Sequence, residues 1–288
     1  MSRTRFTPQA WWYRTQRNLP FYLLALLLMV GLKIHYSRAA SNDLVWILGP
    51  TAAVVEWLGG GDFYREIHAG YLRQDGAFLI APACAGVNFL IMVFGTTVWT
   101  GLPRFRNWRA KLGWLVTVAA AAYLTTVGVN ALRIRAAIAL AGADLHGAWL
   151  TPQRVHRLAG MVVFLPALCL FYLLSERLTA GAFRPAAIHR NDQIPPRPGR
   201  WRDALPLFWY WAVGLGIPLA RAAWHRPNGL FWEHAATLLL WSAMTLPALY
   251  WLRGRRTKPR APTRSLESGP SRPNPLANTP PGPRRSHP

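Results

Sequence analysis

The chain has 288 residues, of which 52% are hydrophobic types and 15 are tryptophan, and its formal net charge at pH 7 is +22. The apolar residues stand in long blocks and not at helical or strand periods, which excludes an ordinary soluble domain and indicates an all-α polytopic membrane protein. The Lys and Arg residues gather between these blocks and in the C-terminal tail, as the positive-inside rule predicts, so we expect no nucleic-acid partner.

The N-terminal arm, residues 1–18, contains four arginines and no acidic residue, and its Trp11, Trp12 and Tyr13 are typical of a membrane interface. We therefore expect this arm to be cytoplasmic. Residues 19–32 form a Leu-rich first span. Because Lys33 follows the span and no small-residue cleavage site is near, we expect an uncleaved helix and not a signal peptide.

Residues 44–58 form a shorter apolar block, which Gly49, Pro50 and Glu56 interrupt. The block is either a short second span or a helix that lies in the outer interface. The basic segments at residues 101–111, at residues 183–202 and after residue 252 belong inside by the positive-inside rule. With those segments inside, one span before residue 77 suffices, and we favour the interfacial helix.

Residues 59–81 are more polar. A strand-like run at residues 67–72, the pair Asp75-Gly76 and a second run at residues 77–80 predict a small β-hairpin on the outer surface. An exposed strand edge there could pair with an extended peptide. An ordinary polar loop would explain the same residues.

The apolar run at residues 77–99 is long enough to cross a bilayer, and it opens with the sequence Ala-Cys-Ala-Gly-Val-Asn-Phe, which includes Cys84 and Asn88. The thiol is therefore expected near the outer membrane face. A thiol is a weak nucleophile until it becomes a thiolate, so cations or bases that reach the same face are of interest. Cys169, inside a later apolar block, is expected to be a small buried core residue.

Two later spans bring candidate partners to this face. Residues 112–129 rise to it and end in Asn130 and Arg133, which share one helix face, and residues 156–174 begin at it with His156. Histidine titrates near neutral pH, as an acid/base partner must. The structural alternatives are a membrane-interface arginine, a helix-capping histidine, and asparagines, Asn88 included, that only bond within or between helices.

The ordered set Cys84-Ala85-Gly86, Asn130-x-x-Arg133-Ile134 and His156-x-x-x-Gly160 resembles the exosortase/archaeosortase family of membrane-embedded protein-sorting enzymes, over residues 21–174. The segment Lys33-x-His35-Tyr36-Ser37 and the Gly-rich stretch before the cysteine look most like the small exosortase K type. The resemblance implies cysteine transpeptidase chemistry on secreted proteins that carry a C-terminal sorting signal, made of a short motif, a transmembrane helix and a basic cluster. It implies that Cys84, Arg133 and His156 are catalytic, with Asn88 and Asn130 as orienting residues, and no metal or cofactor is expected.

The predicted organisation has five parts. The cytoplasmic arm 1–18 precedes a membrane core, residues 19–178. A basic cytoplasmic linker, residues 179–203, leads to a Trp-rich transmembrane hairpin, residues 204–252, and a Pro- and Arg-rich tail, residues 253–288, which should be disordered. The prediction is thus about six spans in a bacterial inner membrane, with both termini inside and the Cys/Arg/His site facing outward.

Two other functions use the same features. In a membrane scaffold or assembly factor, Cys84 would be only a small residue in helix packing. A transporter would need polar or charged groups near the middle of several spans, and the spans after residue 77 offer few. The expected enzyme is a cysteine peptidase or transpeptidase with secreted proteins as substrates and the lipid bilayer around it.

Overall fold

The computed structural model describes residues 8–141, 152–182, 205–216, 219 and 229–254. By its contacts the chain divides into one compact unit, Met1–Leu249, and a second, Tyr250–Pro288, of which only the last residues of one helix are described. The predictions for most of the linker at residues 179–203 and for almost all of the tail at residues 253–288 fall outside the described residues.

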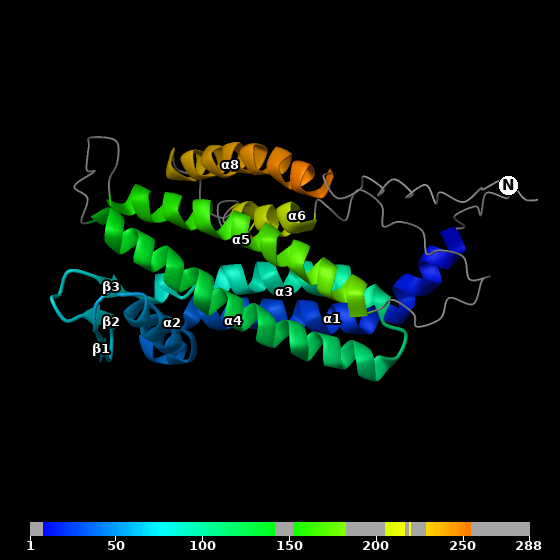
Figure 1. Cartoon of the computed structure of the whole chain (residues 1–288). Helices are drawn as coiled ribbons and strands as arrows, with labels where there is room; N and C mark the ends of the chain where they lie inside the picture. The colour runs from blue at the N-terminus through cyan, green and yellow to red at the C-terminus, as the bar shows by residue number, and fades with distance from the viewer. Residues whose placement is uncertain (1–7, 142–151, 183–204, 217–218, 220–228, 255–288) are drawn as a thin grey trace, which may run out of the picture. The chain divides into compact units, whose positions relative to one another are not determined.

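Among the residues that the structure describes, four helices are long and apolar enough to cross a membrane (Figure 1). They are α1 (Pro8–Arg38), α3 (Val87–Gly101) with its flanking turns, α4 (Trp108–Ala141) and α5 (Pro152–Ala182). The prediction of a mostly helical, membrane-spanning chain is confirmed to this extent.

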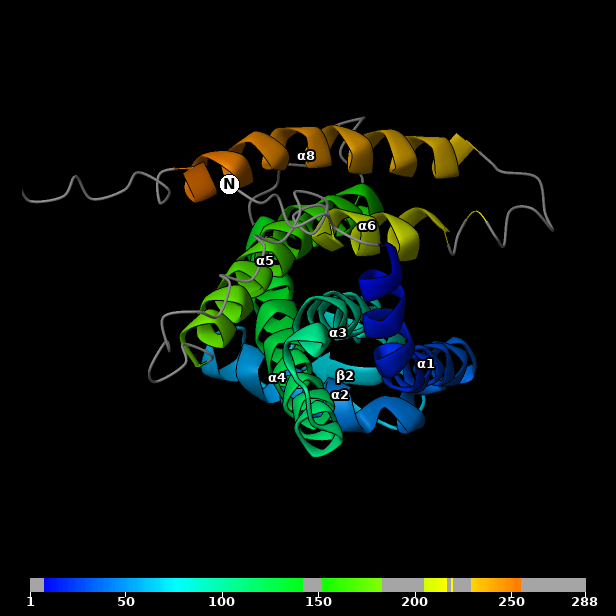
Figure 2. The same ribbon diagram turned by 90° about the vertical axis from the view of Figure 1, so that its right-hand side faces the viewer.

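Helix α3 is the centre of the unit. It contacts α1, α4, α5 and α6 (Leu205–Trp211), which Figure 2 shows around it. The stretch Pro82–Arg104 is 78% buried, whereas the stretches in the other three spanning helices are 11% to 28% buried. A helix that is apolar all round and covered by its neighbours is the core of a bundle, while the exposed leucines of α1 and α4 are suited to lipid.

Helix α2 (Val45–Trp57) follows the short 3-10 turn η1 (Ser41–Leu44). It forms where the sequence predicted either an interfacial helix or a short second span. Its 13 residues give a length of about 20 Å, which is too short for a hydrocarbon layer of about 30 Å. Ile47, Leu48 and Val55 are fully buried, so α2 packs against the bundle along one side.

The predicted hairpin is present, and it belongs to a three-stranded antiparallel sheet in the order β1-β2-β3. The strands are β1 (Phe63–Glu66), β2 (Gly70–Arg73) and β3 (Leu79–Ile80), and the β2–β3 turn contains Gly76 at φ +73°. The predicted first hairpin strand, residues 67–72, overlaps β2 and not β1. Strand β1 was not predicted, because it is charged and largely exposed and has no apolar alternation.

The helices that were expected to begin near residue 77 and near residue 204 differ from the prediction. Residues 79–80 form β3, Pro82–Cys84 form the 3-10 turn η2, and α3 begins only at Val87, because Gly86 has the left-handed φ of +73°. In the C-terminal region the structure describes α6, the π-helical turn η5 (Ala212–Gly216) and α8 (Gly229–Gly254). Trp209 of α6 packs on Trp99 of α3 at 5.0 Å between ring centroids.

Opposite ends of the bundle have different side chains. At the end where α3 passes into η3 (Leu102–Arg104), Arg104 donates to Glu176 and Thr179 of α5, and Lys111 of α4 donates to the Arg17 carbonyl oxygen of α1 at 3.0 Å. At the other end lie the C-terminus of α1, the start of α3, the last turns of α4 and the first turns of α5. The predicted site residues belong to this second end.

Candidate active site

The turn that carries Cys84 is held in place by backbone hydrogen bonds and by one side chain of α4. The Cys84 N–H donates to the Ala81 carbonyl oxygen at 2.8 Å, and Asn130 Nδ2 donates to the Cys84 carbonyl oxygen at 2.5 Å. Cys84 is 6% exposed, while its neighbour Ala83 is exposed. The sulfur therefore lies just below the surface, on a backbone segment with little freedom to move.

Gly86 makes this arrangement possible for two reasons. Its φ of +73° turns the chain from η2 into α3, and side chains rarely adopt that conformation. A Cβ at this position would also lie 3.1 Å from Cγ of Asn130 and 3.3 Å from Cγ2 of Thr126. The glycine thus allows the cysteine turn to approach α4 closely enough for the Asn130 amide to reach the Cys84 carbonyl.

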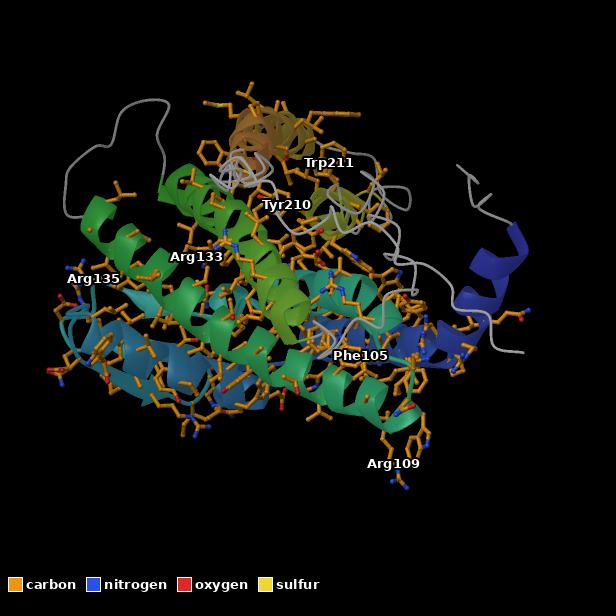
Figure 3. All side chains as sticks on the ribbon, turned by 45° about the vertical axis from the view of Figure 1, so that its right-hand side comes forward. Phe105, Arg109, Arg133, Arg135, Tyr210 and Trp211 are labelled. Atoms are coloured by element: carbon orange, nitrogen blue, oxygen red, sulfur yellow. The ribbon has the colours of Figure 1, made fainter. Side chains whose placement is uncertain are left out.

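Arg133 is buried between α3, α4 and α5, with 6% of its surface exposed (Figure 3). Its guanidinium lies over the Phe164 ring of α5, at 5.2 Å from the ring centroid, and it is a side-chain hydrogen-bonding partner of Cys84. The Phe164 ring also stacks on Phe89 of α3, at 4.7 Å between centroids. The stack Phe89–Phe164–Arg133 therefore ties three helices together and fixes the cation beside the sulfur.

Helix α1 adds two polar side chains to this end of the bundle. The Tyr36 hydroxyl donates to the Pro82 carbonyl oxygen at 3.5 Å, and its phenol lies within electrostatic range of both Cys84 and Arg133. Lys33 lies over the Tyr36 ring at 5.3 Å and donates to Oδ1 of Asn88 at 2.7 Å. Asn88 is thus a partner of α1 through Lys33.

His156 belongs to helix α5, but its side chain lies outside the part of the structure that is described. Two later positions of α5 lie against Arg133: its guanidinium is over the Phe164 ring, and a Cβ on Gly160 would lie 3.8 Å from the Arg133 side chain. The structure therefore brings Cys84, Asn130 and Arg133 together and leaves the imidazole as a prediction.

The part of the chain that holds these residues matches a known protein family. Residues 10–173 match the model of the transmembrane exosortases (Exosortase_EpsH), which is more than half of the chain. The chain belongs to the transmembrane exosortase family. No curated protein and no solved structure matches it.

The match explains which part of this exosortase is shared with its family. It covers α1 to most of α5 and therefore includes every residue of the cysteine turn, Asn130, Arg133 and position 156. Helices α6 and α8 lie beyond it. Membership of the family supports a membrane-embedded sorting enzyme, and the subtype is not distinguished.

No role was predicted for Tyr36, which appeared only in the segment that looks like the exosortase K type. The signal that could have identified it is a polar Lys-x-His-Tyr-Ser group directly after a Leu-rich span, where the end of α1 meets the outer face. Phe164 was not among the predicted site residues. Its position four residues after Gly160 places both on one face of α5, and that spacing was visible in the sequence.

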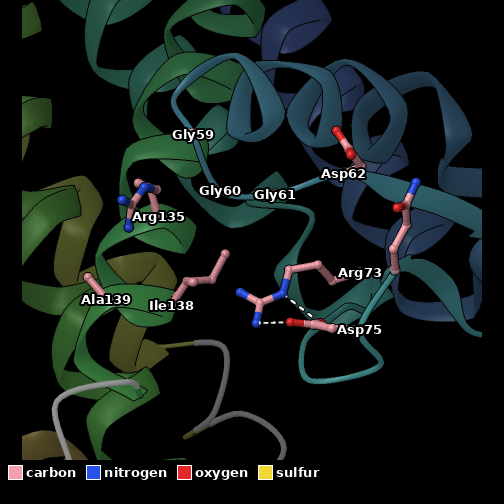
Figure 4. A pocket seen from close by; sticks show the side chains of 10 residues that line it. Gly59, Gly60, Gly61, Asp62, Arg73, Asp75, Arg135, Ile138 and Ala139 are labelled. Carbon is pink, nitrogen blue, oxygen red and sulfur yellow. Dashed lines mark hydrogen bonds and ion pairs between the residues drawn. The ribbon is translucent and has the colours of Figure 1, made fainter.

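Arg135, two residues after Arg133 on α4, points away from Arg133 (Figure 3). It donates through Nε to the Leu58 carbonyl oxygen at 3.2 Å, at the C-terminus of α2. It also lines a cavity of about 630 Å³ together with residues 59–62 and 73–75, where Arg73 and Asp75 form an ion pair (Figure 4). Arg135 thus joins α4 to α2 and the sheet and is not part of the cysteine site.

Proposed function

We propose that this exosortase is a cysteine transpeptidase or peptidase that cleaves C-terminal sorting signals, with Cys84 as nucleophile. The observation that carries the proposal is the buried guanidinium of Arg133 beside the Cys84 side chain. Burying an arginine is costly unless an opposite charge or a ring compensates it. Phe164 supplies part of that compensation, and the thiolate form of Cys84 would supply the rest.

The reaction would proceed in two halves. The Cys84 thiolate attacks the carbonyl carbon of the scissile peptide bond, and Arg133 stabilises the negative oxygen of the tetrahedral intermediate. The C–N bond then breaks, His156 gives its proton to the leaving amine, and a thioester to Cys84 remains. An incoming amine or water attacks the thioester, His156 takes up its proton, and the thiolate leaves.

The spacing along α5 supports a role for His156. Positions 156, 160 and 164 follow one another at four-residue intervals on a single helix, so they share one helix face. Gly160 and Phe164 of this face both lie against Arg133. Asn130, which bonds the Cys84 carbonyl, acts in this proposal by orienting the nucleophile, and Asn88 acts on α1 through Lys33.

The length of α4 supports a site near a membrane face. Its 34 residues give about 50 Å, whereas about 20 residues are enough to cross the hydrocarbon layer. A crossing that begins at residue 112 is complete close to Arg133. We propose that this end is extracytoplasmic in a bacterial inner membrane, that residues 204–220 and 231–252 complete six spans, and that the subtype is exosortase K.

The test of the chemistry compares the two cysteines. Cys84→Ala should abolish cleavage of a secreted reporter that ends in the C-terminal tail of a co-encoded secreted protein. Cys169→Ala is the matched control, because Cys169 is also buried, at 3% exposure, in the apolar middle of α5. Arg133→Ala and His156→Ala should each lower the rate about 100-fold to 1,000-fold. Unchanged cleavage by a well-folded Cys84→Ala variant would support the scaffold and overturn the enzyme.

The orientation has its own test. Ala83 is exposed and adjacent to Cys84, so Ala83→Cys in a Cys84→Ala background gives an accessible thiol at the site. An impermeant maleimide should label it in intact spheroplasts. Protection from outside together with labelling from the cytoplasmic side of inverted vesicles would reverse the proposed topology.

A further inference from the structure

The strand that leads into the nucleophile has an edge that no other strand of the described structure covers. The sheet order is β1-β2-β3, so β3 pairs with β2 on one side only. Three residues separate Ile80, the end of β3, from Cys84. A chain that pairs with this edge would bond the backbone groups of β3 that point away from β2.

The hydrogen-bond register of β2 and β3 determines which backbone groups point to the uncovered edge. In an antiparallel pair both backbone groups of one residue point to the same side, and successive residues alternate. Arg73 N–H donates to the Phe78 carbonyl oxygen, and Tyr71 is the partner of Ile80, so Phe78 and Ile80 point toward β2. The N–H and C=O of Leu79 therefore point away from β2, to the uncovered edge.

The segment continues extended as far as Ala81, whose φ is −80° and ψ 166°. The Ala81 carbonyl oxygen accepts the Cys84 N–H, but the Ala81 N–H follows Leu79 in the alternation and points to the same edge. The side chains agree with a surface edge, since Leu79 is 38% exposed whereas Ile80 is fully buried.

The opposite edge of the sheet is less suited to pairing. The Phe63 N–H of β1 is already bonded to Oε1 of Glu56 at 2.7 Å, and Arg65 of β1 donates to Asn42 at 3.0 Å. Charged side chains along an edge strand are a common device against pairing with another chain. Of the two edges, β3 is the one that is apolar and that leads to the cysteine turn.

We infer that the substrate polypeptide binds in an extended conformation as an added strand on the edge of β3, through the N–H and C=O of Leu79 and the N–H of Ala81. This inference rests on the proposed function and adds how the substrate is held. Five residues from Leu79 to Cys84 span at most about 17 Å, so the paired substrate residue lies within about five residues of the scissile bond. Backbone pairing gives affinity with little dependence on substrate side chains.

The test removes single hydrogen bonds from each partner in turn. Among the hydrogen-bonding groups of β3, Leu79→Pro removes one outward-facing N–H, and proline is tolerated on an edge strand in that position. Cleavage of a synthetic tail peptide by the full chain in detergent should fall about 3-fold to 10-fold in kcat/KM. Leu79→Ala, which keeps the N–H, and Arg65→Pro, on the β1 edge, should leave kcat/KM within about twofold of the wild-type value.

The second arm leaves the protein unchanged. Tail peptides with one backbone amide replaced by an ester, position by position, should show a similar loss at a single position within about five residues of the scissile bond. The ester removes the substrate N–H that donates to the Leu79 carbonyl oxygen, whereas Leu79→Pro removes the N–H that donates to the substrate carbonyl of the same residue pair. The ester loss should therefore be smaller in the Leu79→Pro variant, because the two bonds of one pair are coupled. Equal kcat/KM for every ester peptide, while the wild type cleaves the amide peptide, overturns the strand addition alone. A wild type that cleaves none of them overturns the proposed function, and this inference with it.

Discussion

The substitution Gly86→Ala tests the packing of the cysteine turn against α4 by adding a single methyl group. Two costs follow from the structure. An alanine at φ +73° costs about 1–2 kcal/mol relative to glycine. The new Cβ would also lie 3.1 Å from Cγ of Asn130 and 3.3 Å from Cγ2 of Thr126, and such overpacking of a well-packed site costs about 1–3 kcal/mol.

The total expected destabilisation is therefore about 2–5 kcal/mol. The added methyl group also disturbs a hydrogen bond of the site. Asn130 must move to make room, which lengthens its 2.5 Å bond to the Cys84 carbonyl oxygen. We expect a lower apparent Tm in detergent together with faster alkylation of Cys84 by iodoacetamide, since the buried turn is loosened.

The matched control is Gly128→Ala, in the middle of α4 one turn before Arg133 and with no atom within 4 Å of the new Cβ. It should stabilise the protein by about 0.5–1 kcal/mol, because alanine is favoured over glycine within a helix. The two Gly→Ala changes thus have opposite predicted signs. If Gly86→Ala unfolds at the wild-type temperature and Cys84 reacts at the wild-type rate, the turn does not depend on this glycine.

Two further predictions concern ion pairs away from the cysteine. Arg73 holds the pKa of Asp75 down to about 2 from its usual 3.8, so the ion pair stabilises the β2–β3 turn above pH 4 and is lost as the pH falls toward 2. The Ala77 N–H donates to Asp75, so the protection of this amide against hydrogen exchange should fall over that range. In Asp75→Asn the protection of Ala77 should not change between pH 4 and pH 2. A wild-type protection that stays constant over the same range would contradict this prediction. At the other end of the bundle, a double-mutant cycle of Arg104→Ala and Glu176→Ala should give a coupling of about 1 kcal/mol, and strict additivity would show that the pair does not form.

The sequence was sufficient for the long helices because a bilayer demands runs of about 20 apolar residues, which no local detail obscures. The sequence was less informative where local hydrogen bonds and backbone conformation determine the structure. The helix start expected near residue 77 lies at Val87, since residues 79–80 pair with β2 and Gly86 turns the chain. Strand β1 was missed because its residues Tyr64, Arg65 and Glu66 are exposed and have no apolar pattern.

The candidate site shows a similar division. Cys84 and Arg133 were predictable as a pair because the order of spans puts both at one end of the bundle. Tyr36 and Phe164 were not, because their importance comes from contacts across helices: the phenol reaches the carbonyl of Pro82, and the Phe164 ring contacts both Phe89 and Arg133. Sequence spacing places residues on a face, but it does not say which side chain on the next helix that face meets.

These contacts bear on why the site is built around a buried turn and not on the helix itself. A cysteine within a helix would have its N–H bonded to the carbonyl four residues earlier, and its position would move with the helix. Here β3 and Gly86 fix the turn from both sides, Asn130 fixes its carbonyl, and Arg133 is fixed by the stack on Phe164. The sulfur and the cation are therefore held by separate elements, and in the proposed reaction both would be in place before a substrate binds. Such preorganisation is what electrostatic stabilisation of an oxyanion requires, because no reorganisation is then needed as charge develops.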